Sequence, residues 1–309
     1  MNRRILIIAL VLLCATFALA AEGTFNRTLN VGANAEVEIG GGSGNITVHS
    51  GEAGKISIVG HVKTSNYSAW NWFGGSGSAD DKIKRIVDKP PVEQSGNWVR
   101  VGRIEDESLR NGISIDYDVT VPKDTRLRAN TGSGDVRVED VSASVSAHTG
   151  SGNMRLRNLA GEVEAQAGSG DIEAFNLGGP IRVRTGSGNV HVQSSGNGDV
   201  RAGAGSGDLT IDGVKGGLEA STGSGNVRAS GNPGDRWTLH TGSGDVHLAL
   251  EKNAKFTIEA RSMSGSVRSD MPITVSGTME RHAIRGSVNG GGPTVEVHTG
   301  SGNIEVLSR

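Results

Sequence analysis

The stretch Thr131-Gly132-Ser133-Gly134-Asp135-Val136-Arg137-Val138 decides the fold, because its Gly-Ser-Gly-Asp/Asn segment recurs at a nearly fixed interval. The first glycines of the copies are Gly132, Gly150, Gly168, Gly186, Gly205, Gly223 and Gly242, in steps of 18, 18, 18, 19, 18 and 19 residues. Such a period is typical of stacked identical units, since one unit cannot bury its apolar face alone. The repeat therefore predicts a solenoid.

Each repeat contains two short strand patterns. After the Gly-Ser-Gly turn, Val136 and Val138 alternate with charged residues, and further on Val145 and Ala147 alternate with polar ones. Alternation with a period of two indicates half-buried strands. We therefore predict an all-β fold, a parallel two-sheet β-solenoid with coils of 18–19 residues and an irregular N-terminal cap. Like strands of successive coils are expected to pair in parallel, about 4.8 Å apart.

The two corners of a coil differ in their tolerance of insertions. Extra residues fall at the second corner, in 194–199 and 231–236, whereas the Gly-Ser-Gly corner never changes length. Glycines at the fixed corner are expected to supply positive φ angles or close backbone approach.

The residue after each Gly-Ser-Gly alternates between charged and neutral. The series is Asp135, Asn153, Asp171, Asn189, Asp208, Asn226 and Asp245. A column made only of aspartates would repel by about 0.9 kcal/mol per step even in water. Alternating Asn doubles the charge separation, and its amide can donate to carboxylates above and below, while backbone N–H groups of the glycine turn can satisfy the remaining acceptors. We interpret the series as a structural ladder that holds the fixed corner and opposes slippage by one coil.

A calcium-binding β-roll is an alternative, because 18 is twice the nine-residue period of calcium rolls. Here, however, the Asp follows the glycine directly, and the second corner has no matching motif. Neutral Asn at alternate rungs also removes anionic ligands that a hard cation prefers. We therefore predict no cofactor and no metal site.

Two other columns precede the turn. His148, His240 and His298 each stand before Thr-Gly-Ser-Gly, but five coils, or about 24 Å, separate His148 from His240, so these two cannot share an ion. We interpret the histidines as solvated strand residues. The threonines Thr131, Thr149, Thr185, Thr222, Thr241 and Thr299 form a fuller ladder. They predict hydrogen bonds between coils or, alternatively, a flat array that faces ice or glycan.

Residues 1–20 carry the features of a cleavable signal peptide: Arg3 and Arg4, then an apolar stretch of 13 residues over 5–17, then Ala18-Leu19-Ala20. An uncleaved anchor is a weaker interpretation, as is lipidation at Cys14, because Leu13 occupies the place of a small residue. Cleavage would remove the single cysteine and with it all thiol chemistry. No other segment approaches the roughly 20 apolar residues of a membrane span.

Composition narrows the classes of function. The formal net charge of −2 does not suggest nucleic acid or an anionic membrane surface as a partner. Aromatic residues make up 4% of the chain, which favours a thin core of small aliphatic side chains. The serines lie in repeated turns without a unique Ser/His/Asp set, and no helix follows the glycine turns as a phosphate loop requires. We therefore predict that the chain is not an enzyme.

We divide the chain into the signal peptide (1–20), an N-terminal cap with first coils and an aromatic insertion (21–131), and the repeat solenoid (132–309), the last two forming one continuous domain. The cap contains an early repeat at 42–48, a predicted helix at 80–87, and predicted strands at 97–103 and 113–122. After Leu250 the repeat decays, and it returns at 300–306.

The insertion gathers three aromatic residues, Trp70, Trp72 and Phe73, within four positions. Exposed aromatics on a loop predict a patch for a ligand or protein partner. The alternative is that they cover an open end of the solenoid, which needs a cap against edge-to-edge association.

The sequence resembles the bacterial putative adhesin family known as domain of unknown function 4097. The resemblance rests on Tyr117-Asp118-Val119-Thr120-Val121-Pro122-Lys123 and on the Thr-Gly-Ser-Gly-Asp-Val segment at 131–136 with its repeats, and covers most of residues 25–309. It implies a β-solenoid and an exported, adhesin-like binding role, with no catalytic residues to transfer.

Together these features predict an exported, non-enzymatic binding or scaffold protein of the bacterial cell envelope, periplasmic or associated with the cell surface. The expected partner is a protein or an envelope glycan. The alternatives are a calcium-binding β-roll and a β-helical polysaccharide lyase or hydrolase, which would need a groove that gathers Arg, Lys and two carboxylates.

Overall fold

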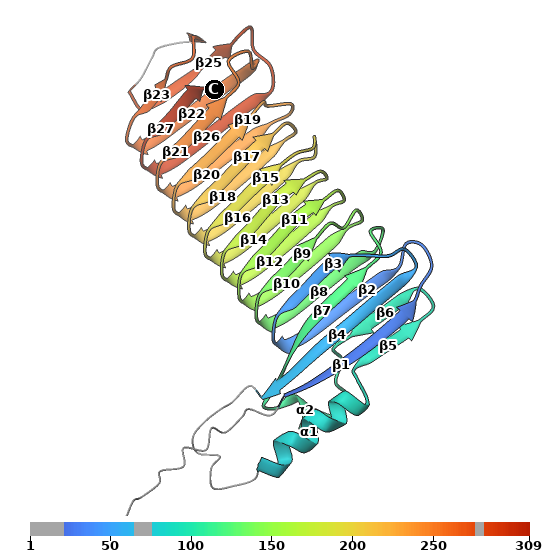
Figure 1. The fold of residues 1–309 in the computed structure, drawn as a ribbon. Helices are drawn as coiled ribbons and strands as arrows, with labels where there is room; N and C mark the ends of the chain where they lie inside the picture. The colour runs from blue at the N-terminus through green and yellow to red at the C-terminus, as the bar shows by residue number, and fades with distance from the viewer. Residues whose placement is uncertain (1–21, 65–75, 276–280) are drawn as a thin grey trace, which may run out of the picture.

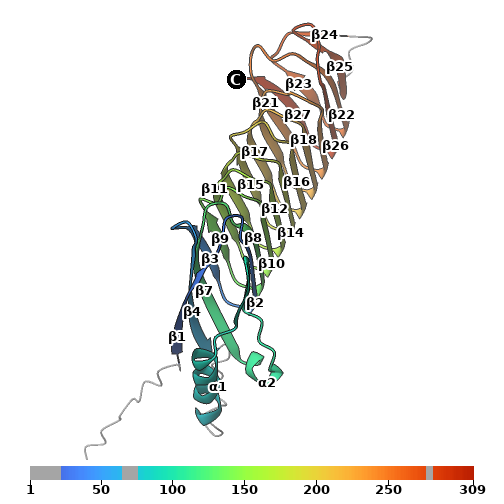
Figure 2. The same cartoon turned by 90° about the vertical axis from the view of Figure 1, so that its right-hand side faces the viewer.

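The computed structural model describes residues 22–64, 76–275 and 281–309, and it forms an elongated rod of two long β-sheets (Figure 1). Figure 2 shows the sheets as two thin layers along the rod. Two helices, α1 (Ser76–Asp88) and α2 (Glu107–Arg110), lie at the N-terminal end, and the C-terminus lies at the opposite end. The prediction of an all-β, two-sheet β-solenoid is confirmed. The predicted signal peptide lies outside the described residues.

Each regular coil gives one strand to each sheet, and all these strands pair in parallel. Sheet A contains β9 (Val136–Glu139), β11 (Met154–Leu159), β13 (Ile172–Leu177), β15 (Val190–Ser194), β17 (Leu209–Val214), β19 (Val227–Gly231) and β21 (Val246–Leu250). Sheet B contains β8 (Arg126–Ser133), β10 (Val145–Ser151), β12 (Val163–Ser169), β14 (Ile181–Ser187), β16 (Val200–Ser206), β18 (Leu218–Ser224) and β20 (Trp237–Ser243).

The core is the narrow space between the sheets, filled by every second side chain of each strand. On β9, Val136 and Val138 are buried and Arg137 is exposed, and the later strands repeat this pattern. Most core residues are Val, Ile, Leu and Ala. Burial of each larger aliphatic side chain contributes about 1.5–3 kcal/mol, so stability accumulates coil by coil. Trp237 is fully buried, and its indole N–H donates to the carbonyl oxygen of Gly216 at 3.0 Å.

The fixed corner is tight because the glycines of adjacent coils stack directly on one another. Gly170 has φ 137°, and a Cβ added there would collide with the carbonyl oxygen of Gly152 in the coil before it. The same collision would occur at Gly188 against Gly170. The corner therefore keeps its length and its glycines because a backbone atom of the preceding coil occupies the space of a side chain.

At the N-terminal end, the order of strands in space departs from their order in the chain. The first coil, β2 (Glu36–Ser43) and β3 (Ile46–Ser50), pairs directly with β8 and β9. The later strands β6 (Trp98–Val101) and β7 (Ile113–Val121) then add outside it. Antiparallel strands complete the two sheets, namely β4 (Lys55–Thr64) and β1 (Glu22–Asn30) in sheet A and β5 (Val92–Ser95) in sheet B.

The C-terminal end departs in the same way. The last coil, β26 (Thr294–Ser301) and β27 (Ile304–Ser308), pairs with β20 and β21. It lies between them and the earlier coil of β22 (Phe256–Ser264) and β23 (Val267–Ser269). Two antiparallel strands, β25 (Ala283–Val288) and β24 (Ile273–Val275), lie beyond β22 in sheet B. The expectation that successive coils pair is thus wrong at both ends.

The two terminal coils differ in their residue at the corner. Gly300 lies against the carbonyl oxygen of Gly242, which occupies the space of a side chain. In the outer coil, Met263 occupies the place that pairs with Gly300, and its side chain is 80% exposed. The complete repeat at 300–306 forms the inner coil, and the decayed repeat forms the outer one.

Helix α1 agrees with the predicted helix at 80–87 but begins four residues earlier. Ile83 and Ile86 are buried, and α1 packs against β1 and β4. Its position beside β1 shields an edge of sheet A that could otherwise pair with another chain.

Candidate binding faces

The Asp/Asn series forms a continuous hydrogen-bonded ladder along the fixed corner. At each step, Oδ1 of one rung accepts the backbone N–H of the next, at 2.8 Å from Asn153 to Asp135 and 3.0 Å from Asp171 to Asn153. In spatial order the ladder contains Asp116, Asn45, Asp135, Asn153, Asp171, Asn189, Asp208, Asn226, Asp245, Asn303 and Ser266. Asp and Asn alternate strictly from Asp116 to Asn303, although the rungs come from distant parts of the chain.

Backbone N–H groups supply most of the donors in the ladder. We expected Asn amides to donate to the carboxylates, and such a bond is present from Nδ2 of Asn226 to Asp208 at 3.3 Å. The bond repeated at every step instead uses the backbone N–H of the rung. Since the Oδ1 atoms accept these N–H groups, the ladder's carboxylates are already used in holding coils together. Its role in opposing slippage remains a prediction.

Asp116 begins the ladder and is also held by a cation. Its Oδ1 accepts the N–H of Asn45 at 2.8 Å, and Oδ2 pairs with Nζ of Lys63 at 2.9 Å. Partial burial raises the pKa of Asp116, but the bonds from Lys63 and Asn45 outweigh it, so the pKa lies below its ordinary value. The same pairing raises the pKa of Lys63. The two side chains fasten the capping strands β4 and β7 together.

The threonine ladder points inward. Thr149 is fully buried, and its hydroxyl donates to the carbonyl oxygen of Gly134 in the preceding coil at 3.0 Å. The same bond recurs from Thr185 to Gly170 and from Thr222 to Gly207. A buried column cannot contact ice or glycan, so the alternative of a flat external array is wrong, and the hydroxyls bond between coils.

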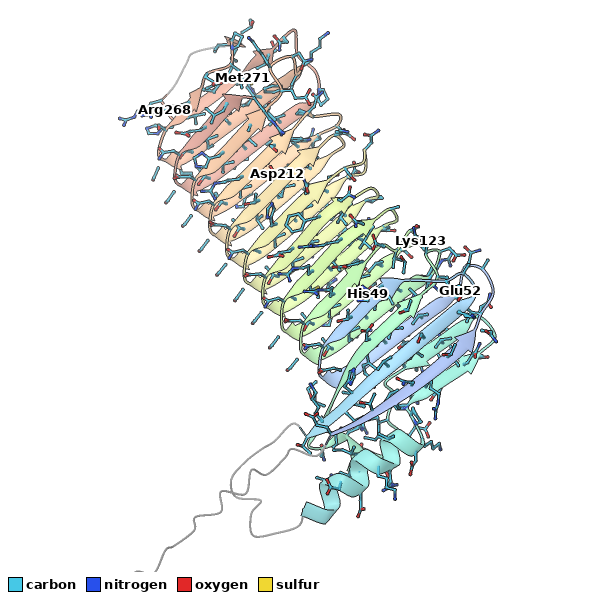
Figure 3. The ribbon with its side chains drawn as sticks, in the orientation of Figure 1. His49, Glu52, Lys123, Asp212, Arg268 and Met271 are labelled. Carbon is cyan, nitrogen blue, oxygen red and sulfur yellow. The ribbon has the colours of Figure 1, made fainter. Side chains whose placement is uncertain are left out.

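The outer faces of both sheets carry polar side chains in straight columns, because parallel strands in register stack equivalent residues. Figure 3 shows these side chains standing in rows along the rod, with Asp212 of sheet A among them. One column of sheet B contains Asn130, His148, Gln166, Arg184, Gly203, Ser221, His240 and His298. Each face is therefore a long, flat and chemically varied surface.

The inserted last coil changes the positions of the histidines. His148 and His240 lie far apart along this column, as expected. His298, however, pairs with His240 on the neighbouring strand, and its Nε2 lies 3.1 Å from Oε1 of Glu296. Sequence spacing alone did not indicate this neighbourhood.

Sheet A carries an aromatic side chain on its outer face. Phe175 is partly exposed, and His191 meets its ring edge-on with 4.8 Å between ring centroids. The guanidinium carbon of Arg157 lies 5.9 Å from the ring centroid. Beside it, Nε of Arg155 bonds Oε2 of Glu173 at 2.8 Å, and this bond lowers the pKa of Glu173. The group is a small aromatic platform bordered by charges.

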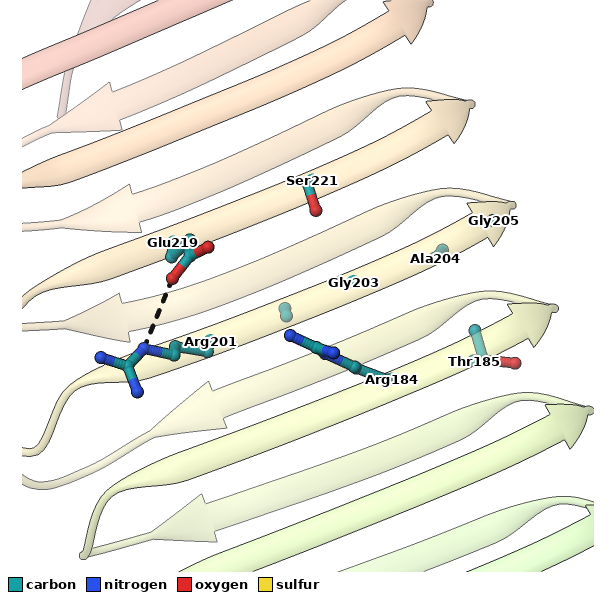
Figure 4. A pocket seen from close by; sticks show the side chains of 9 residues that line it. Arg184, Thr185, Arg201, Gly203, Ala204, Gly205, Glu219 and Ser221 are labelled. Atoms are coloured by element: carbon teal, nitrogen blue, oxygen red, sulfur yellow. Dashed lines mark ion pairs between the residues drawn. The ribbon is translucent and has the colours of Figure 1, made fainter.

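Sheet B is hollowed at Gly203, and we call this the Gly203 hollow (Figure 4). Its lining consists of Arg184, Thr185, Arg201, Ala202, Gly203, Ala204, Gly205, Glu219 and Ser221. Arg184 and Ser221 stand on the strands to either side of Gly203. Nε of Arg201 lies 3.4 Å from Oε2 of Glu219 at one end. The hollow exists because the column of outward side chains is interrupted at one residue.

A second hollow surrounds the turn at 251–255. It is lined by Glu251, Lys252, Asn253, Lys255, Asn289 and Arg309. Like the Gly203 hollow, it carries more basic than acidic side chains. It is lined, however, by a turn, by Asn289 and by Arg309 rather than by the face of a sheet.

Neither hollow meets the requirement for the lyase alternative. The Gly203 hollow gathers two arginines with one carboxylate, and the second hollow gathers three cations with one carboxylate. Across 22–64, 76–275 and 281–309, no group of three or more His, Asp or Glu side chains is arranged to hold a metal ion. The helices in these ranges are too short or too polar for a membrane crossing.

The predicted patch of Trp70, Trp72 and Phe73 lies outside the described residues. The segment that contains it connects β4 to α1. Its role as a partner patch or an end cap therefore remains a prediction. The Gly203 hollow was not recognised from the sequence. Its one signal was a glycine at an outward position of a strand, in Arg201-Ala202-Gly203-Ala204.

The stacked coils and the glycine corner define a parallel β-solenoid of two sheets. The chain belongs to the Toastrack family DUF4097, whose model matches residues 28–205 and 111–307, and this confirms the family resemblance. No curated protein matches the chain.

Three of the solved structures that match the chain are from Bacteroides fragilis, Clostridium sporogenes and Parabacteroides distasonis. A "putative adhesin" from Bacteroides fragilis is 15% identical, covering 93% of this chain and 97% of its own, with a TM-score of 0.34. A "putative cell adhesion protein" from Clostridium sporogenes is 14% identical over 93% of this chain and 100% of its own, with a TM-score of 0.22. A "putative lipid binding protein" from Parabacteroides distasonis is 11% identical over 93% and 97%, with a TM-score of 0.29.

Proposed function

We propose that the protein is an exported, non-enzymatic binding or scaffold module of the bacterial cell envelope. The observation that carries this proposal is the presentation of polar side chains in register on two long, flat sheets. Such a surface offers many weak contacts at a fixed spacing, and linked weak contacts add to a strong attachment. The names of the similar structures agree with a binding role.

Export is supported by residues 1–20, whose basic start, apolar stretch and small-residue end match a signal peptide. The partner class that best fits the outer faces is an envelope glycan, with an envelope protein as the second choice. Arginine, glutamate, histidine and one aromatic ring stand within reach of each other on these faces, and such groups recognise sugar hydroxyls and acidic substituents.

The test combines localisation with binding. The full chain is produced in a bacterial host, and cell fractions are examined for a product that begins at Ala21. The purified mature chain is then sedimented with isolated envelope particles, before and after carbohydrate is removed. We expect an exported product and co-sedimentation that falls when carbohydrate is removed. A product that stays in the cytoplasm, or a mature chain that sediments with no envelope fraction, would overturn the proposal.

Two further measurements address the alternatives. A calcium roll would lose thermal stability on addition of EDTA, whereas we expect no shift. A lyase or hydrolase would shorten acidic polysaccharides during incubation, whereas we expect their length distribution to be unchanged.

A further inference from the structure

We propose that the Gly203 hollow binds an acidic sugar, a hexuronate unit of a glycan, with Arg184 as the partner of its carboxylate. This inference rests on the proposed binding function and specifies the ligand class and the site. Four features of the hollow support it: its charge, its floor, its hydroxyl-binding groups and the glycine that creates it.

The charge of the hollow favours a carboxylate. Three arginines stand on neighbouring strands β14 and β16, and two of them are already paired, Arg182 with Glu162 and Arg201 with Glu219. Arg184 has no ion-pair partner among the residues that the structure describes, and it is exposed beside the hollow. A guanidinium group offers a planar pair of N–H donors that matches a carboxylate.

The floor of the hollow suits a flat ring. It is made of Gly203, Ala204 and Gly205, so no side chain longer than a methyl group rises from this part of β16. Ala204 is partly exposed, although the threonines at the same place in most coils are buried. A sugar ring laid on this floor would contact backbone atoms, while its edge faces the polar walls.

The walls supply partners for hydroxyl groups. Ser221 stands opposite Arg184 across Gly203, and Glu219 borders the same space (Figure 4). A carboxylate such as Glu219 accepts hydrogen bonds from sugar hydroxyls but repels a compact, highly charged anion. The combination therefore favours a sugar unit that carries one carboxylate and several hydroxyl groups over inorganic phosphate or sulfate.

Gly203 is not required by packing, which distinguishes it from the corner glycines. An added Cβ would lie 3.7 Å from Cγ of Arg184 and 3.8 Å from the oxygens of Ser221, and these are ordinary contacts. Glycine within a strand weakens the strand and often marks a place where a ligand approaches the backbone. The absent side chain at this position thus serves the hollow.

The experiment is calorimetric titration of the mature chain with trigalacturonate. Three probes serve as comparisons: the same trisaccharide with its carboxyl groups reduced, sodium sulfate and sodium phosphate. The variants are Arg184→Gln, which removes the charge, and Gly203→Gln, which places in the hollow the residue that Gln166 supplies two coils earlier. Arg137→Gln is the matched control, an exposed arginine of sheet A without an ion pair in the described ranges.

We expect trigalacturonate to bind the wild type and the reduced trisaccharide not to bind. Arg184→Gln should weaken binding by about tenfold to a hundredfold, the usual effect of losing a charged hydrogen-bond partner. Gly203→Gln should abolish binding while its melting temperature stays the same or rises, which separates the site from the fold. Arg137→Gln should bind like the wild type.

Several results would overturn the inference. Equal binding of sulfate or phosphate and trigalacturonate would identify an unspecific anion site. Full affinity in both hollow variants, with loss on Lys252→Gln and Lys255→Gln, would place the site in the second hollow. If the mature chain binds envelope particles but no trigalacturonate, this inference fails and the proposed function stands. If it binds neither, both fail.

Discussion

The fixed corner and the outer face of sheet B use the same residue type for opposite purposes. At the corner, Gly170 lies against the carbonyl of Gly152, and no side chain fits. On the face, Gly203 has room for a side chain and carries none. The corner is thus determined by contact between coils, whereas the face is free to vary and can be shaped for a ligand. A repeat protein can in this way keep one edge constant and change the rest.

The difference between the two glycines is tested most strongly by adding a methyl group at both positions. Gly170→Ala should destabilise the protein by about 3 kcal/mol or more, because it combines a strained positive φ with overpacking against the preceding coil. Gly203→Ala should instead stabilise it by about 0.5–1 kcal/mol, since alanine reduces the flexibility of the unfolded chain. Urea unfolding of both variants measures the difference, and equal effects would contradict the distinction.

The next largest expected effect on stability concerns Asp116, the first residue of the Asp/Asn ladder. Because Asp116 has a lowered pKa in the folded state, its charge stabilises the fold above the ordinary value of 3.8, and this contribution is lost as pH falls through the folded pKa. Asp116→Asn should lower the free energy of unfolding by about 1–2 kcal/mol near neutral pH, chiefly through loss of the Lys63 pair. Unfolding of both proteins over pH 2–8 should show the difference shrinking in acid. A difference independent of pH would contradict the assignment.

The smallest expected effect concerns the buried hydroxyls. Thr149→Val keeps the shape of the side chain but removes the bond to the carbonyl of Gly134, and should cost about 1 kcal/mol. Thermal unfolding provides the measurement, with Thr238→Val, a half-buried residue on the outer face, as the matched control. If Thr149→Val is as stable as the wild type, the threonine ladder is held by packing alone.

The regular part of the fold could be predicted from the sequence because its two signals agree. The interval between glycines gives the length of a coil, and the alternation at Val136 and Val138 gives the buried side of a strand. Both depend on contacts that recur identically in each coil. The buried Thr149 was less clear from the sequence, since a threonine before a turn can face either side of a strand.

The ends could not be predicted by counting residues, because the chain passes over one coil position and returns to fill it. The alternation of Asp and Asn along the ladder does indicate this order of coils. Asn45 precedes Asp135 and Asn303 follows Asp245 in the alternation, whereas Ser266 interrupts it. Strict alternation in space would have placed the coil of Asn303 directly beside that of Asp245, which is where it lies.

The Gly203 hollow could not be recognised beforehand for a different reason. One glycine in a chain with 48 glycines carries little information until its surroundings are known. Only the register of β14, β16 and β18 shows that Arg184 and Ser221 flank it and that nothing fills the space. The aromatic patch at Trp70, Trp72 and Phe73 was the more visible feature of the sequence and remains a prediction.

The central claim is that the Asp/Asn alternation limits charge repulsion in a stacked column. It is tested most directly by the melting temperature of Asn153→Asp/Asn189→Asp/Asn226→Asp as a function of salt. Each new carboxylate would stand about 4.8 Å from two others, and each contact would cost about 0.9 kcal/mol or more without screening. The converse variant, Asp135→Asn/Asp171→Asn/Asp208→Asn, keeps every Oδ1 acceptor and serves as the control.

We predict that the aspartate variant melts several degrees below the wild type at 10 mM salt. At 1 M salt, where charges are screened within about 3 Å, it should recover most of this loss. The asparagine variant should melt close to the wild type at both concentrations. An aspartate variant with an unchanged melting temperature at low salt, or with an equal loss at both concentrations, would contradict the claim.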